Sequence, residues 1–223
     1  VERYLASLPS LKREETWKDW RVAPPEGVVK RVVEKGVEPK SLTAIVFSGP
    51  FEDEPANRIN IRAAAQVLET RLRKLLRETL SGTYNVRVQP SYGRIPREEF
   101  RMGIDLGTDP ARIDEMTAAI FDEIKKLKKD GPTPQEVEEV RLAESRDYET
   151  DSRQNGWWLA MLTESCRLGE DPAEIARIPE TFDLLTRESI QSAARRYYDT
   201  DRYVQVTLYP EKVAWLRQLE VNK

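Results

Sequence analysis

The chain contains no histidine among its 223 residues and only one cysteine, Cys166. It therefore lacks the commonest metal ligand and the usual base for a serine or cysteine nucleophile. A single cysteine excludes an internal disulfide and a cysteine-rich zinc cluster, and it leaves the redox compartment open. Because Cys166 lies within a run, residues 161–166, that predicts a helix, we expect a small buried thiol there. The composition thus predicts no metal site in this chain.

Long apolar runs are also missing. No stretch approaches the ~20 apolar residues that cross a membrane, and no signal peptide opens the chain. The 36 Lys and Arg residues balance 39 Asp and Glu residues, and no basic stripe of the kind that binds nucleic acid stands out. The lysines of residues 125–129 suit a helix C-terminus, where cations are stabilised. We therefore expect neither a membrane span nor a nucleic-acid partner.

The length suits one large domain with an appendage. Residues 1–25 end in Pro24 and Pro25, and they predict a linker or the tail of a preceding domain. Residues 26–219 are expected to form one domain. Since the chain begins at Val1 and not at Met, we expect it to belong to a longer protein.

Hydrophobic periodicity predicts both strands and helices in the domain. Strands are expected at residues 28–33, 42–47, 83–89, 99–106 and 203–208. Helices are expected after Pro55, from Asp109-Pro110, after Thr133, at 157–167, near 172–178 and at 187–197. Short links between neighbouring strands favour antiparallel pairing, and grouped helices favour one covered face. We predict an α+β fold with a mixed, mainly antiparallel sheet and helices packed on one face.

Arg77 and Tyr84 are the first candidates for chemistry. Arg77 falls in the last turn of the helix after Pro55, and Tyr84 opens the next predicted strand. A turn at Ser81-Gly82 would bring both side chains to one end of the sheet. A guanidinium and a phenol aimed at one point can donate hydrogen bonds to a developing oxyanion, and neither loses a proton in doing so. An arginine at a helix end and a tyrosine at a strand start are also common without any chemical role.

The segment Leu76-Arg77-Glu78-Thr79-Leu80-Ser81-Gly82-Thr83-Tyr84-Asn85-Val86 resembles Leu-Arg-Glu-x-Leu-Gly-x-x-Tyr-x-Val in the C-terminal domains of pitrilysin/insulinase-type zinc metallopeptidases. Further similar segments run from residue 28 to 212. They are Lys35–Ser41, Tyr92, Asp109–Glu115, Asp130–Thr133, Asn155–Trp158 and Val206–Glu211. The opening Tyr4–Pro9 is similar to the end of a preceding domain, which would make this the last domain of a longer chain.

This resemblance implies that Arg77 and Tyr84 stabilise the transition state of peptide cleavage from a domain that binds no zinc. Ser81 departs from the family pattern, which has glycine after Leu80, and Gly82 follows directly. The inverted zinc motif H-x-x-E-H is absent. The resemblance therefore implies zinc in another half of the protease, with that half and a peptide substrate as partners. It suits a bacterial periplasmic or extracytoplasmic parent, and this chain alone is expected to be inactive.

Other residues carry weaker expectations. We expect Phe51, which follows a strand, to be exposed and to contact peptide, with Tyr92 as a second substrate contact. The acidic loop Glu52-Asp53-Glu54 predicts a solvated turn and matches no calcium loop. Of Trp157 and Trp158, at least one is expected in the core, and the other could line a substrate chamber.

Two other interpretations remain open from the sequence. One is a non-catalytic scaffold or partner subunit of the same fold, although such a scaffold has no need of the Arg77–Tyr84 pair. The other is an unrelated α+β module that binds protein.

Overall fold

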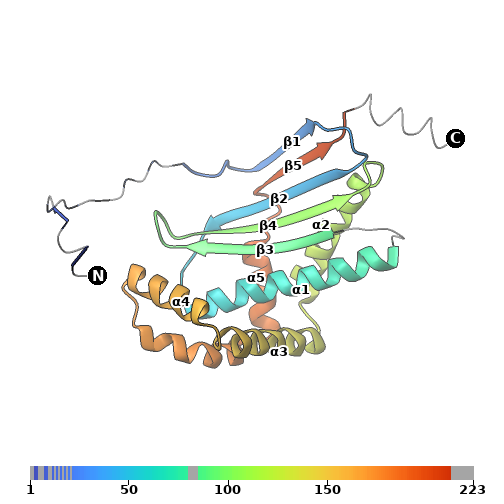
Figure 1. Ribbon diagram of the computed structural model, residues 1–223. Coiled ribbons are helices and arrows are strands. Elements are labelled where there is room, and N and C mark those ends of the chain that lie inside the picture. The colour runs from blue at the N-terminus through green and yellow to red at the C-terminus, as the bar shows by residue number, and fades with distance from the viewer. Residues whose placement is uncertain are drawn as a thin grey trace.

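The computed structural model describes residues 22–79 and 85–211, together with isolated positions before residue 22. Within them, five strands form one twisted sheet (Figure 1). The strands are β1 (Val28–Glu34), β2 (Ser41–Pro50), β3 (Asn85–Gly93), β4 (Glu99–Thr108) and β5 (Tyr203–Tyr209). Their order across the sheet is β1-β5-β2-β4-β3. All neighbouring pairs are antiparallel except β1 with β5, which is parallel, so the predicted mixed, mainly antiparallel sheet is confirmed.

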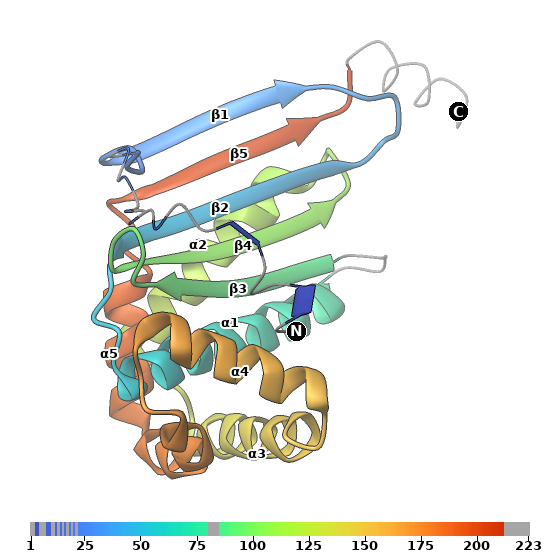
Figure 2. The ribbon, with the colours of Figure 1, turned by 60° about the vertical axis from the view of Figure 1, so that its left-hand side comes forward.

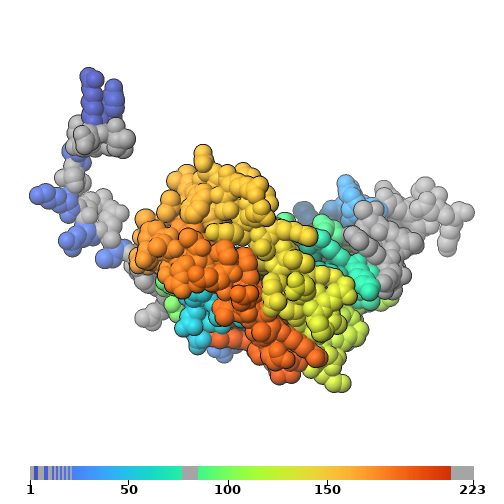
Figure 3. Space-filling model, turned by 90° about the horizontal axis from the view of Figure 1, so that it is seen from below, coloured from blue at the N-terminus to red at the C-terminus, as the bar shows by residue number. Residues whose placement is uncertain are grey.

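The helices lie in two layers on one side of the sheet (Figures 1 and 2). They are α1 (Pro55–Thr79), α2 (Ile113–Asp130), α3 (Pro134–Asp151), α4 (Asn155–Leu168), the 3₁₀ helix η2 (Pro172–Leu184) and α5 (Arg187–Tyr197). Helices α1, α2 and α5 contact the strands, whereas α3, α4 and η2 form the outer layer. Seen from below, this outer layer and α5 cover most of the surface (Figure 3). No described helix is long and apolar enough to cross a membrane.

Helix α1 lies at the centre of the fold and packs against β3, α2, α3, α5 and η2. A helix that is surrounded in this way is apolar on most sides. Its fully buried residues include Ile59, Ile61, Ala63, Ala64, Val67, Leu68 and Leu72. Burying a side chain of the size of leucine contributes about 1.5–3 kcal/mol. The sequence therefore anchors α1 firmly in the core from Ile59 to Leu76.

The sequence signals for a helix start predict the beginning of α3 correctly and that of α2 wrongly. At α3 the Thr133 side chain accepts a hydrogen bond from the Glu136 N–H, and the Glu136 carboxylate accepts one from the Thr133 N–H, so a capping box forms at the helix start predicted after Thr133. The predicted start of α2 at Asp109-Pro110 is wrong, because the helix begins at Ile113. There the Asp109 carboxylate accepts a hydrogen bond from the Ala111 N–H and closes a turn before the helix.

The expected burial of Cys166 is also wrong, because its side chain is exposed on α4. Helix α4 belongs to the outer layer and packs chiefly on η2. Its outward face carries Leu159 and Leu162, which are both exposed. A helix in an outer layer buries one narrow face, so an apolar position on it does not ensure burial.

The outer edge of β3 is partly closed to further strand pairing. The Glu69 carboxylate of α1 accepts a hydrogen bond from the Val88 N–H at 2.7 Å. Two residues further on, Pro90 has no N–H to offer. Both features are common protections of an edge strand.

We expect Glu136→Gln to lower the free energy of unfolding by about 1–2 kcal/mol at pH 7. Although burial opposes the shift, the hydrogen bonds from Arg71 and the Thr133 N–H hold the pKa of Glu136 below its ordinary value. A depressed carboxyl pKa stabilises the fold above the pKa of the unfolded chain. That stabilisation is lost as the pH falls through the folded pKa.

Urea unfolding at several pH values measures this effect. The difference between the two proteins should shrink as the pH falls from about 5 to 3. Glu139→Gln, at an exposed position of the same helix, is the matched control and should change little. If Glu136→Gln lowers the free energy of unfolding by the same amount at both ends of this pH range, the stabilisation does not come from the ionised Glu136 carboxylate.

Candidate functional site

The predicted pair falls at the connection between α1 and β3. Arg77 lies in the last turn of α1, but its side chain and the whole of Tyr84 lie outside the described part of the structure. The described chain ends at Thr79 on one side of the connection and resumes at Asn85 on the other. The role of Arg77 and Tyr84 therefore stays a prediction.

Phe51 and Tyr92 meet at the other end of α1. Their rings stack with centroids 4.9 Å apart and an interplanar angle of 20°. The expected exposure of Phe51 is wrong, because only 1% of this residue is accessible and its ring also packs against Tyr197. Tyr92 is only partly buried and packs over Phe51. Of the two residues, only Tyr92 is placed to contact a ligand.

The acidic loop between β2 and α1 is not a solvated turn throughout. The Asp53 side chain is only 3% exposed, whereas Glu52 is 70% exposed. The loop is held on both sides, because Phe51 is buried and the Asn57 amide donates a hydrogen bond to the Glu52 carbonyl. A buried carboxylate needs charged or hydrogen-bonding partners.

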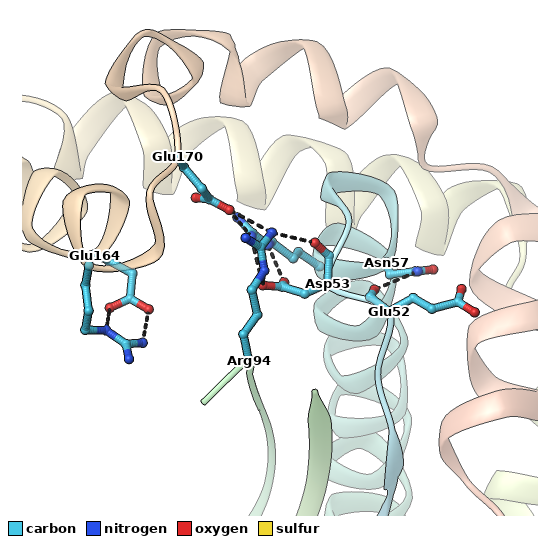
Figure 4. Close-up of polar contacts among 8 residues, drawn as sticks. Glu52, Asp53, Asn57, Arg94, Glu164 and Glu170 are labelled. Carbon is cyan, nitrogen blue, oxygen red and sulfur yellow. Dashed lines mark hydrogen bonds and ion pairs between the residues drawn. The ribbon is translucent and has the colours of Figure 1, made fainter. Parts of the chain in front are cut away.

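Two arginines surround Asp53 (Figure 4). The Arg58 Nε and Nη2 atoms donate to the two Asp53 carboxylate oxygens at 2.5 and 2.9 Å. The Arg94 Nε atom lies 2.6 Å from the Asp53 carboxylate, and its Nη2 donates to the Asp53 carbonyl. Fork-like contacts of this kind are the strongest and most directional that arginine makes.

Glu170 closes the cluster from the opposite side. Its carboxylate accepts hydrogen bonds from Arg58 at 2.6 Å and pairs with Arg94 at 2.8 Å. Figure 4 shows Glu170 reaching down from the turn after α4 toward Arg94 and Asp53. Gly169 makes this turn in the left-handed conformation, with φ of 69°, and the Ser165 hydroxyl donates to the Glu170 carbonyl. The four side chains join the loop before α1, the β3–β4 turn and the α4–η2 turn.

Charge and burial shift the pKa values of groups around this cluster. Burial alone would lower the pKa of Arg58, but Asp53 and Glu170 raise it above its ordinary value. Burial raises the pKa of Tyr92, so its hydroxyl stays protonated at neutral pH. Burial likewise raises the pKa of Glu144, although its partner Arg62, with Nη2 2.7 Å from the Glu144 carboxylate, opposes the shift.

A cavity of about 430 Å³ opens next to the cluster, between α1, Tyr92, α4 and η2. Its apolar surface comes mainly from Ile59, Tyr92, Met161, Ile175, Ile178 and Leu184. Charged side chains surround this surface, among them Arg58, Arg62 and Glu170. An apolar pocket with a few convergent polar groups is typical of a binding site. The expected core position of Trp157 or Trp158 is wrong, because both are only half-buried, and neither lines this cavity.

The residues of this chain do not fit a zinc site. The sequence has no histidine, and its only cysteine is exposed on α4. Among residues 22–79 and 85–211, no three His, Cys, Asp or Glu side chains gather closely enough to hold a metal ion. Zinc prefers histidine and thiolate ligands, so the described residues offer it no adequate ligand set.

The sequence pointed to Tyr92 but not to the ionic cluster beside it. Asp53 and Arg58 are close in sequence, yet their spacing alone does not separate a buried pair from two solvated charges. Arg94 and Glu170 come from distant turns, and Glu170 lies 112 residues after Arg58. The only sequence signal was an acidic loop directly before a helix, which is common at helix starts.

A profile of the peptidase M16 inactive domain matches residues 1–143. A mutant of the ferredoxin protease FusC, in complex with Arabidopsis ferredoxin, aligns with a TM-score of 0.79 and 20% identity over 95% of this chain and 23% of that one. The periplasmic protease PqqL from Escherichia coli aligns with a TM-score of 0.72 and 19% identity, over 84% of this chain and 21% of that one. A peptidase M16 inactive domain from Pseudomonas fluorescens aligns with a TM-score of 0.71 and 17% identity, over 85% of this chain and 45% of that one.

The chain thus spans less than a quarter of the first two of these structures. At such identities the likeness shows the fold. Comparison with curated protein sequences gives no significant match.

Proposed function

This chain belongs to the peptidase M16 inactive-domain family, and on that premise we propose that it is the C-terminal, non-zinc-binding domain of a zinc metalloendopeptidase. The family match over residues 1–143 carries the proposal. The absence of histidine supports the assignment of zinc to another half, on the same chain or on a partner subunit. Alone, the chain is inactive.

In this proposal Arg77 and Tyr84 act on the peptide at the connection between α1 and β3. The Arg77 guanidinium is always charged, and the Tyr84 hydroxyl is a neutral donor at physiological pH. Both donate hydrogen bonds to the carbonyl oxygen of the cleaved bond, and these bonds strengthen as negative charge develops on that oxygen. The burial of α1 up to Leu76 supports such a role, because it anchors the helix one residue before Arg77.

Tyr92 is the second substrate contact in the proposal. It lies at the end of β3, lines the cavity and keeps a protonated hydroxyl there. Phe51 acts indirectly, by supporting the Tyr92 ring from the core. The domain as a whole forms one wall of the chamber in which the peptide is held.

The rival function is a scaffold that supplies surface to a protease but no chemistry. The family itself is described as an inactive domain, which favours this alternative. The two functions differ in what they require of Arg77 and Tyr84, since a scaffold tolerates any residues at these positions that preserve the fold.

Recombination of the two halves tests the proposal. We expect no peptide cleavage by this chain alone and little by the zinc-binding half alone, but cleavage when both are mixed. An Arg77→Ala, Tyr84→Phe double variant of this chain should bind the zinc-binding half as well as the parent chain does. The mixture of the two should cleave the peptide poorly. Full cleavage by the mixture containing the double variant would favour the scaffold.

A further inference from the structure

The cavity between α1, α4 and η2 combines an apolar floor with an unbalanced charged rim. In the floor, Ile59 and Ile175 are buried, whereas Leu184, at the outer end of the floor, is 46% exposed. The volume of about 430 Å³ lies within the usual range for ligand sites. The floor is therefore suited to a large aliphatic or aromatic side chain.

The rim favours a positively charged ligand. Five carboxylates and three guanidinium groups line the cavity, and Arg167 and Arg94 outside the lining pair with two of the carboxylates, Glu164 and Glu170. Arg58 is engaged by Asp53 and Glu170, and Arg62 is engaged by Glu144. At the outer rim, Glu174 and Glu180 share the single guanidinium of Arg177.

This sharing leaves surplus negative charge at the mouth of the cavity. Both glutamates and Arg177 are more than half exposed, so an incoming cation can reach them. A lysine or arginine next to an apolar residue would satisfy the floor and the rim together.

Strand β3 relates the cavity to the place in the sequence where the predicted reaction site falls. Tyr84 directly precedes β3, and Tyr92 near the end of this strand lines the cavity. At about 3.3 Å per residue, the strand from Asn85 to Tyr92 spans roughly 23 Å. An extended peptide would cover this distance with about seven or eight residues.

We propose that this cavity binds an apolar residue flanked by a basic residue in the peptide substrate, about eight residues from the cleaved bond. The inference rests on the proposed function for its substrate, because it takes the occupant to be the peptide that the protease cleaves. The apolar side chain enters above Ile59 and Ile175, and the basic side chain pairs with Glu174 and Glu180. Substrates too short to reach from Tyr84 to Tyr92 gain nothing from the cavity.

The test uses the full-length protein and fluorescein-labelled peptides of 14 and 6 residues, each containing one Leu-Arg pair. The rim variant is Glu174→Gln with Glu180→Gln, and the floor variant is Leu184→Ala. Two exposed glutamates of α3 give the matched control Glu138→Gln with Glu149→Gln, and Leu162→Ala on α4 is the control for the floor. All these positions are partly or fully exposed, so little effect on folding is expected.

Fluorescence anisotropy gives Kd without requiring cleavage, and steady-state kinetics give KM and kcat. For the 14-residue peptide we expect Kd and KM to rise about 3- to 10-fold in the rim and floor variants, with kcat unchanged. The rim effect should disappear at about 1 M salt, whereas the floor effect should remain. The KM of the 6-residue peptide should not change, because it cannot reach the cavity while its bond is cleaved, and both control variants should leave Kd and KM unchanged.

An unchanged Kd for the long peptide in both cavity variants would overturn the proposal, as would an equal rise in KM for the short peptide. Loss of affinity only in the floor variant would show that the cavity recognises the apolar residue and not the basic one. It would overturn the proposal that the substrate carries a basic residue next to the apolar residue. Failure of the proposed function is separate. It would appear as normal turnover in Arg77→Ala and Tyr84→Phe, independently of the Kd values that anisotropy gives for the cavity variants.

Discussion

We expect Arg77→Ala and Tyr84→Phe each to lower the turnover of the full-length protein by about 10²–10³-fold. Each variant removes one donor to the oxygen on which negative charge develops. Such a donor matters more in the transition state than in the bound substrate, so kcat should fall more than KM rises. Because neither residue binds metal in this proposal, the zinc content should remain that of the parent protein.

The measurement is kcat and KM on one peptide, with the zinc content determined on the same samples. Lys74→Ala is the matched control, because Lys74 is an exposed cation on the same helix, one turn before Arg77. Its removal should leave kcat within about two-fold of the parent value. Turnover that survives in both Arg77→Ala and Tyr84→Phe would remove these residues from the mechanism and leave the scaffold function.

The largest expected effect on stability comes from Asp53→Asn, which should lower the free energy of unfolding by about 2–3 kcal/mol. Asparagine has nearly the same shape, but it leaves Arg58 and Arg94 with Glu170 as their shared carboxylate. Breaking a fully buried ion pair on one side costs about 3–5 kcal/mol. The value here is lower because water reaches both arginines, whose side chains are 28% and 30% exposed.

Urea unfolding checks this prediction. The slope of the free energy of unfolding against urea concentration should be similar in the variant and the parent protein, which indicates that both unfold in the same reaction. Glu52→Gln supplies the control in the same loop, since Glu52 is exposed and meets Arg196 only at 3.3 Å. That substitution should cost less than about 0.5 kcal/mol. Equal losses in the two variants would mean that the cluster around Asp53 contributes no more than an ordinary surface ion pair.

The sequence predicted best those features whose determinants lie within a few residues of each other. The capping box at Thr133 requires only Thr133 and Glu136, and the alternation of β4 is visible in Phe100, Met102 and Ile104. Asp109-Pro110 shows the limit of such signals. A proline after an aspartate suits both a helix start and a turn, and only the path from β4 into α2 selects the turn.

The candidate site depended on partners that are distant in sequence. Phe51 is buried because Tyr92 and Tyr197 pack around it, and Asp53 is buried because Arg94 and Glu170 reach it from other turns. Neither environment leaves a local pattern, so both residues had the features of an exposed loop. Burial follows from the tertiary arrangement, and a single sequence without long-range information does not specify it.

The position of β5 between β1 and β2 also determines when this domain can finish folding. Strand β5, the last strand among the described residues, enters the interior of the sheet, and its neighbours precede it by well over a hundred residues. Contacts of such long range form slowly, because a large loop must close before they provide any stabilisation. Until residue 209 has left the ribosome, β1 has no partner in this sheet and β2 exposes an edge of apolar and β-branched residues. The nascent chain is therefore most prone to aggregate in this interval, and a truncation that removes β5 should leave an insoluble product.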